Sequence, residues 1–254
     1  MATPQDHYRN LLAHHYSWMF GLSFDEKVAE QRAILEPLLR DIPRGQAVDL
    51  GSGPGYQSFA LAQLGFSPVL ALDTSAELLS ELEAAVRSHA YPDVQTHNAD
   101  MLLLLDYIRP GAASAIVCMG DTLTHLTSPD DVRGLFRAVA TALAPGGLFV
   151  LTWRDLTHEL TGTDRFIPVR SDEDRIMTCF LETTSPTTVQ VNDLIYTRDP
   201  TKRTWALAKS SYPKLRLAPA WIATELTAAG FDPEPPGTAG RLSLLCARRN
   251  TNQP

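Results

Sequence analysis

A glycine-rich loop is the first feature of this sequence that could do chemistry. The segment Gly51–Gly55 reads GSGPG and directly follows the apolar run Val48–Leu50. Glycine permits a tight turn and lets a ligand approach the backbone N–H groups at the start of a helix. The pattern therefore predicts a ligand-binding loop between a strand and a helix.

The spacing of this loop and of a later carboxylate separates two classes of ligand. A dinucleotide fingerprint, GxGxxG, would place its third glycine at position 56, where this chain has Tyr56. The third glycine comes one residue earlier, at Gly55. Asp73 lies 22 positions after Gly51, a distance that suits a carboxylate accepting hydrogen bonds from both hydroxyls of a ribose.

Short apolar runs alternate with helical patterns between about residues 44 and 153, and this alternation must position the loop. Thr74-Ser75-Ala76-Glu77 is a capping-box pattern at one helix start, and Ser128-Pro129 begins another. The alternation predicts an α/β fold with a doubly wound, mostly parallel sheet of seven strands. The core strands are expected at 47–50, 68–73, 94–97, 114–119 and 147–153.

The two flanks of this region carry other patterns. Residues 5–20 have apolar residues at helical spacing, and a capped helix from Ser23 should run to about Arg40, with a kink or restart at Pro37. Polarity then alternates over three later segments, which predicts an antiparallel meander. These segments are 176–184, 188–198 and 204–212, and a helix is expected at 219–229.

Composition narrows the class of protein. The 254 residues include 29 acidic and 22 basic side chains, a net charge of −7 without a basic block, which disfavours nucleic acid as a partner. Three widely spaced cysteines predict reduced thiols in a cytoplasmic protein. Neither a signal peptide nor an apolar run of membrane length is visible, so we expect no membrane partner. No His/Cys cluster has ligand spacing, so we expect no metal.

Five motifs follow one another between about residues 44 and 155. They are Asp49–Gly55, Asp73, Asn98–Met101, Val117–Gly120 and Leu143–Gly147, the last reading LAPGG. In this order they resemble the motifs of the class I S-adenosylmethionine-dependent methyltransferases. The resemblance implies S-adenosyl-L-methionine (SAM) as cofactor and S-adenosyl-L-homocysteine (SAH) as product.

The resemblance also implies roles for individual residues. Gly51, Ser52 and Gly53 would lie against the methionine part of SAM, where Asp49 would orient the loop or meet the ammonium group. Asp73 would hold the ribose. The full set of implied cofactor-binding residues is Tyr16, Asp49, Gly51, Ser52, Gly53, Gly55, Asp73, Thr74, Asp100, Met101, Met119 and Gly120.

The segment Gly120–Leu126 reads GDTLTHL and looks like the GNSxxHL stretch of the glycine and sarcosine N-methyltransferases. Those enzymes follow the PGG strand with an arginine that holds the substrate carboxylate, matched here by Arg154. Asp121 replaces their asparagine and Trp153 stands in place of a histidine, so the likeness is architectural. It implies a small-molecule acceptor contacted by Trp18, Met19, Arg154 and Tyr212.

His125 and Asp121 are the candidate catalytic residues. Methylation of a neutral amine needs only desolvation and alignment, whereas a hydroxyl acceptor benefits from a general base. A purely structural role remains open for each of these residues: His125 hydrogen-bonded to the backbone, or Asp121 capping a turn. The same holds for the acceptor and lid candidates, with a salt bridge at Arg154 and core packing at Tyr16, Trp18 and Met19.

We therefore expect four parts. These are a helical lid over 1–43, a SAM-binding core over 44–155, an antiparallel cap inserted after strand five over 156–215, and closing elements over 216–254. The expected function is methyl transfer to N or O of a small molecule, by a monomer or homodimer. The alternatives are a nucleotide-dependent oxidoreductase, a non-catalytic SAM-binding regulator, and a methyltransferase acting on a macromolecule.

Overall fold

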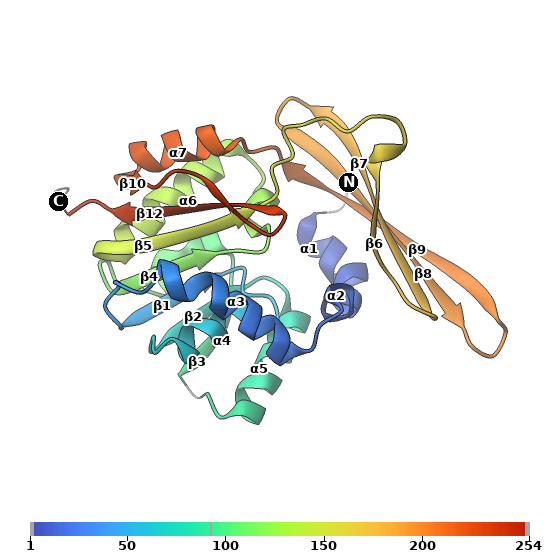
Figure 1. Ribbon diagram of the computed structural model, residues 1–254, viewed down its shortest axis with the longest axis horizontal. Helices are drawn as coiled ribbons and strands as arrows, with labels where there is room; N and C mark the ends of the chain where they lie inside the picture. Colours follow the sequence, from blue (N-terminus) through green and yellow to red (C-terminus); the bar gives the residue numbers. More distant parts are fainter. Residues whose placement is uncertain (1–2, 92, 252–254) are drawn as a thin grey trace.

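The computed structural model describes residues 3–91 and 93–251, which form two β-sheets (Figure 1). The central sheet contains β1 (Gln46–Leu50), β2 (Val69–Asp73), β3 (Val94–Asn98), β4 (Ala113–Cys118), β5 (Leu143–Trp153), β10 (Phe231–Pro233), β11 (Gly237–Ala239) and β12 (Leu242–Arg249). The strand order is β10-β12-β5-β4-β1-β2-β3, and β11 pairs only with β12. Strands β1 to β5 are parallel and β12 runs antiparallel to β5, which confirms the predicted doubly wound sheet.

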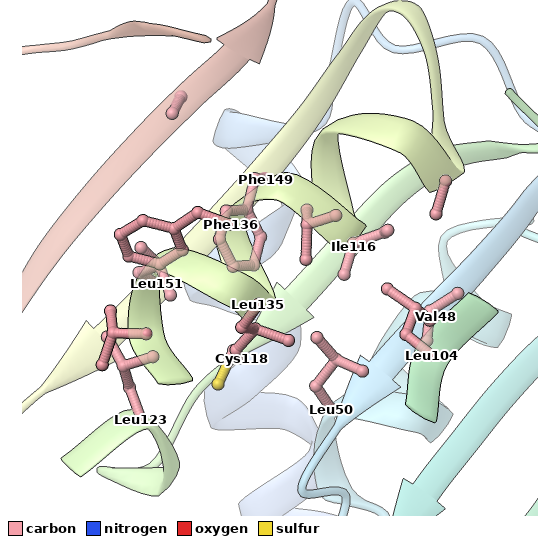
Figure 2. Packing of buried hydrophobic residues seen from close by; sticks show 14 of the residues in the cluster. Val48, Leu50, Leu104, Ile116, Cys118, Leu123, Leu135, Phe136, Phe149 and Leu151 are labelled. Atoms are coloured by element: carbon pink, nitrogen blue, oxygen red, sulfur yellow. The ribbon is translucent and has the colours of Figure 1, made fainter. Parts of the chain in front are cut away.

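Helices cover both faces of the central sheet. The helices α3 (Phe24–Leu38), α4 (Tyr56–Gln63) and α5 (Ala76–His89) pack on one face, and α6 (Pro129–Ala142) and α7 (Pro219–Ala228) on the other. In Figure 2, Phe136 of α6 lies against Phe149 of β5, with ring centroids 6.0 Å apart. None of the helices within the described ranges is long and apolar enough to cross a membrane.

A second, antiparallel sheet follows β5 and forms the cap. Its strands are β6 (Phe166–Ser171), β7 (Arg175–Ser185), β8 (Thr188–Asp199) and β9 (Thr204–Leu215), paired in that order. The sequence predicted the last three strands. β6 escaped prediction because Pro168 and an irregularity between Pro168 and Arg170 break its alternation.

The N-terminal segment lies between the two sheets (Figure 1). It comprises α1 (Pro4–His7), the π-helical turn η1 (Tyr8–Leu12) and α2 (Ala13–Phe20). Leu11 and Leu12 are buried against Met177 and Ile195 of the cap. The segment ends at Gly21, whose φ of +72° is left-handed, as expected for a helix stop.

Three local expectations differ from the structure. Ser75, rather than Thr74, caps α5, because its hydroxyl accepts the hydrogen bond from Leu78 N. Helix α3 continues past Pro37 and ends at Leu38, so the hydrogen bond that proline cannot make falls in the last turn. β5 begins at Leu143 rather than at residue 147.

Two tight contacts beneath the glycine loop fix it to the helices. Gly55 has a φ of +95°, and a Cβ atom there would lie 2.1 Å from Cδ1 of Leu82 on α5. The buried carboxylate of Asp49 on β1 accepts a hydrogen bond of 2.6 Å from the Ser58 hydroxyl on α4. Burial raises the pKa of Asp49 to about 7, because desolvation penalises the charged form.

Substitution of Gly55 should destabilise the fold. We expect Gly55→Ala to lower the free energy of unfolding by about 1–2 kcal/mol for the left-handed backbone and by about 1–3 kcal/mol more for the clash with Leu82. Gly111 is the matched control, since it also has a positive φ but a Cβ atom there would have nothing within 4 Å. Urea unfolding that gives equal losses for Gly55→Ala and Gly111→Ala would show that Leu82 is not a steric barrier.

The Asp49 carboxyl should make stability depend on pH. Its pKa in the folded state lies above the unfolded value of about 4, so the folded state binds the proton more tightly and stability falls as pH rises from about 4 to 7. Asp49→Asn lacks this titration. We expect the variant to gain about 2–4 kcal/mol relative to the wild type between pH 4 and pH 8. Urea unfolding at both pH values measures the difference in unfolding free energy between the variant and the wild type. An equal difference at pH 4 and pH 8 would contradict a raised pKa.

Candidate active site

Two adjoining cavities lie at the carboxyl ends of the parallel strands. The smaller has a volume of about 110 Å³ and the larger about 290 Å³. Tyr8, Tyr16, Gly51 and His125 line both of them. The sheet order reverses between β1 and β4, which is where ligands bind in open α/β sheets.

The glycine loop uses its amide hydrogens within the protein. Gly51 N and Ser52 N donate to Leu72 O at 2.8 and 3.0 Å, and Gly55 N donates to Ser52 O at 3.0 Å. Gly53 N donates to Asp73 Oδ2 at 2.7 Å. A diphosphate site needs such amides directed at the ligand. The loop geometry therefore counts against a dinucleotide cofactor.

Asp73 lines the smaller cavity at the end of β2. Its second carboxylate oxygen, Oδ1, accepts a hydrogen bond of 2.8 Å from Ser75 N. Burial raises the pKa of Asp73, although backbone hydrogen bonds from Ser75, Gly53 and Thr74 partly oppose this. Each carboxylate oxygen can accept more than one hydrogen bond, so Asp73 can still bind a hydroxyl in the cavity.

Ser52 lines the larger cavity with an unsatisfied hydroxyl. Its Oγ atom is buried and has no hydrogen-bond partner among the described residues. A buried polar atom without a partner is unfavourable, so this position suits a polar group of a ligand. Met119 and Gly120 line the same cavity, whereas Thr74, Asp100 and Met101 line the smaller one. These features fit SAM. Its amino-acid end would need a polar site, and its adenosyl end would need a site that is partly apolar.

His125 is partly buried where the two cavities meet. Its ring lies between those of Tyr8 and Tyr212, with centroids 5.7 and 5.6 Å away. Its Nε2 atom is buried and makes no hydrogen bond within the described part of the chain. Burial lowers the pKa of His125 to about 3, so the ring is neutral at physiological pH.

Asp121 holds together three parts of the site. Its Oδ2 atom lies 2.5 Å from Lys214 Nζ on the cap. Its Oδ1 atom accepts hydrogen bonds from Arg154 N at 2.9 Å and from the Thr124 hydroxyl at 3.0 Å. Burial is the largest influence on this carboxyl and opposes its ionisation. The charge of Lys214, the nearby His125 and the hydrogen bonds from Lys214 and Arg154 together outweigh burial, so the pKa of Asp121 is lowered. These contacts favour a positioning role over the catalytic role considered from the sequence.

The candidate acceptor residues do not all lie together. Met19, Arg154 and Tyr212 line the larger cavity. Trp18 instead packs on the cap, where its Nε1 donates to Asp172 Oδ2 at 2.5 Å and its ring lies between Arg170 and Arg175. Two of the candidate cofactor residues line neither cavity. Asp49 is hydrogen-bonded to Ser58 of α4, and Gly55 lies against Leu82 of α5.

Several lining residues were not foreseen from the sequence. Lys214, Asp193 and Arg241 line the larger cavity. Asp193 did carry a signal, because it alternates with Val191 and Ile195 on the apolar face of β8. No group of three or more His, Cys, Asp or Glu side chains within residues 3–91 and 93–251 could hold a metal ion.

Comparison with known proteins gives a consistent result. A family profile described as a methyltransferase domain matches residues 47–147. A glycine/sarcosine N-methyltransferase of Halorhodospira halochloris is 33% identical over 42% of this chain and 39% of its own length. A trans-aconitate 2-methyltransferase of Rhizobium meliloti is 32% identical over 54% and 49%. The chain thus spans about half or less of these two curated relatives.

Solved structures share the fold over nearly the whole chain. An S-adenosylmethionine-dependent methyltransferase from Clostridium acetobutylicum superposes with a TM-score of 0.75 at 17% identity, covering 95% of this chain and 99% of that one. A SAM-bound amino pentose methyltransferase from Micromonospora echinaspora has a TM-score of 0.71 at 18% identity, covering 93% and 96%. These structures show that the fold is shared over nearly the whole chain. The methyltransferase-domain match over residues 47–147, together with the methyltransferase relatives, supports a class I S-adenosylmethionine-dependent methyltransferase with SAM as its cofactor.

Proposed function

We propose that this chain methylates a small molecule enclosed between the core, the N-terminal segment and the cap. The observation that carries the proposal is the larger cavity of about 290 Å³, which runs from Ser52 and Gly120 of the core to Tyr212 of the cap. When bound, SAM supplies a methyl group already activated on a sulfonium. The protein then has mainly to align donor and acceptor and to exclude water.

Each end of the cofactor has a matching group in the proposed arrangement. Asp73 accepts hydrogen bonds from the ribose, and Asp100 and Met101 contact the adenine. The unsatisfied hydroxyl of Ser52 binds the amino-acid end. Met119 and Gly120 support the sulfonium side of the larger cavity.

The charges around the larger cavity favour an acceptor that carries an anionic group. Two pairs of oppositely charged lining residues compensate each other: Lys27 with Glu30 at 2.9 Å and Lys214 with Asp121 at 2.5 Å. A third carboxylate, Asp193, lies 2.9 Å from the His7 imidazole. The Nε atom of Arg154 is 3.8 Å from Asp121, and Arg241 has no acidic partner within 4 Å among the described side chains. The two guanidinium groups therefore leave positive charge facing the cavity. Glycine, sarcosine and trans-aconitate, named for the relatives, all carry carboxylates.

His125 supports nitrogen over oxygen as the methylated atom. Burial makes the ring a weak base, with a pKa of about 3, so it is poorly suited to deprotonating a hydroxyl. Its free Nε2 can still accept a hydrogen bond from an N–H group. An amine could be oriented in this way without transferring its proton to His125.

The open cavity counts against a purely regulatory role. A SAM-binding protein that had lost its activity would not need to maintain a large space beside the cofactor loop. The cap also covers the site, which counts against a macromolecular acceptor. The alternative of a nucleotide-dependent oxidoreductase is disfavoured by the glycine loop, whose amides are already bonded within the chain.

The cofactor assignment can be tested at Asp73. Asp73→Ala should weaken SAH binding by about tenfold or more, because charge-assisted hydrogen bonds to the ribose are lost together with the bond to Gly53 N. Calorimetry with SAH and with NADH provides the measurement. The exposed Asp232→Ala is a matched control and should bind like the wild type. Unchanged SAH affinity of a folded Asp73→Ala variant, or tighter binding of NADH, would refute the assignment.

The charge of the acceptor can be tested at Arg154. With labelled SAM, we expect turnover of carboxylate acceptors such as glycine or trans-aconitate to exceed that of their neutral amides. Arg154→Lys keeps the charge but loses the planar fork, so it should resemble Arg154→Ala, with both kcat and KM impaired. If Arg154 only supports Asp121, both variants will lose stability while activity per folded molecule stays constant.

A further inference from the structure

Hydrogen bonds attach the N-terminal segment to the cap at two points, on either side of the packing of Leu11 and Leu12 against the cap. Near its start, His7 Nε2 lies 2.9 Å from Asp193 Oδ2 on β8. Near its end, Trp18 Nε1 donates to Asp172, and Arg170 of β6 donates to the Trp18 carbonyl oxygen. The Trp18 contacts are at the surface, whereas His7 and Asp193 are 0% and 3% exposed. The first attachment is therefore sealed from water.

The His7–Asp193 pair has a defined geometry. The His7 ring stacks on Tyr212 with centroids 4.2 Å apart and an interplanar angle of 30°. The Asp193 carboxylate lines the larger cavity, and within 4 Å no Lys or Arg of the described chain compensates it. A buried carboxylate that loses a hydrogen-bond donor is strongly unfavourable. The pair is thus strong enough to fix where the segment lies.

The residues next to His7 form a wall of both cavities. Pro4, Gln5, Tyr8 and Tyr16 line the smaller cavity, and Tyr8 and Tyr16 also line the larger one. Because Tyr8 directly follows His7 in the chain, the position of His7 sets the position of this wall. The segment also contacts the core: Tyr16 and Phe20 pack against the core cluster that includes Tyr56, and the Ser17 hydroxyl donates to Glu81 at 2.7 Å.

We propose that His7 is a positioning residue: its hydrogen bond to Asp193 seats the N-terminal segment against the cap, so that Tyr8 and Tyr16 close over the cofactor. This inference rests on the proposed function. His7 touches neither cavity and acts through Asp193 and Tyr8. Breaking the bond should leave the cofactor groups of the core unchanged, yet weaken binding because the closed arrangement is less populated.

Three substitutions separate the bond from the bulk of the ring. His7→Phe keeps the stacking on Tyr212 and removes the donor. His7→Gln places an amide nitrogen as many bonds from the backbone as Nε2, so it can restore the bond, whereas His7→Asn is one bond too short. The matched control is His89→Gln, since His89 and Asp25 form an exposed pair at 3.2 Å that includes no residue of 4–20 and no residue lining either cavity.

The measurements are SAH affinity by calorimetry and hydrogen exchange of residues 4–20 with and without SAH. We expect SAH to protect this segment in the wild type. His7→Phe and His7→Asn should bind SAH about tenfold more weakly and exchange faster there, while His7→Gln stays within about threefold of the wild type. Asp193→Leu should behave like His7→Phe, because it removes the same bond.

The outcomes distinguish this inference from the proposed function. If wild-type protein does not bind SAH, the proposed function fails, and exchange of residues 4–20 without ligand still reports whether His7 holds the segment. If wild type binds SAH but His7→Phe matches it in affinity and exchange, the positioning role is overturned. The same conclusion follows if His7→Gln is no better than His7→Asn.

Discussion

One buried carboxylate, Asp121, joins the parts that enclose the acceptor cavity. It accepts hydrogen bonds from the Lys214 ammonium of the cap, from the backbone N–H of Arg154 at the end of β5 and from the Thr124 hydroxyl in its own turn. Gly120 and Asp121 have consecutive φ values of +73° and +79°, a conformation that costs about 1 kcal/mol or more for aspartate. Three hydrogen bonds offset that strain. Without this carboxylate, Lys214 would be a buried cation with no acidic partner among the described side chains, and the cap would lose a polar link to the core.

The motif-bearing core could be predicted because its signals are local. Each signal depends on residues that are close in sequence: the glycine loop, Asp73 and the helix N-cap at Ser128. The structure has these features where they were expected. The N-cap of helix α5 is Ser75, one residue after the expected Thr74. The two adjacent hydroxyl side chains are chemically alike, so the sequence does not distinguish them. General rules on crossovers then predict a doubly wound parallel sheet, whereas the strand order itself comes from the structure.

The remainder of the site could not be predicted because it depends on contacts between distant segments. His7 and Asp193 are 186 residues apart, and Lys214 and Asp121 are 93 apart. Nothing near His7 in the sequence distinguishes it from His14 or His15. Trp18 was expected at the acceptor as part of an N-terminal lid, but the turn at Asp172 and two cap arginines provide it with other partners. Asp49 was expected to orient the loop or to meet the ammonium group of the ligand, and its carboxylate accepts a hydrogen bond from Ser58 of α4.

The junction of the two cavities imposes a constraint on the side chains around it. In the proposed reaction, the sulfonium lies near this junction, where Tyr8, Tyr16, Gly51 and His125 line both spaces. A protonated histidine there would repel a cationic cofactor in a site of low dielectric constant. Burial removes this conflict, because it lowers the pKa of His125 to about 3 and keeps the ring neutral. The tyrosines add hydroxyl oxygens without formal charge, since burial raises the pKa of Tyr8 and Tyr16 above their usual value. The same enclosure that excludes water therefore sets the ionisation states that methyl transfer from a sulfonium requires.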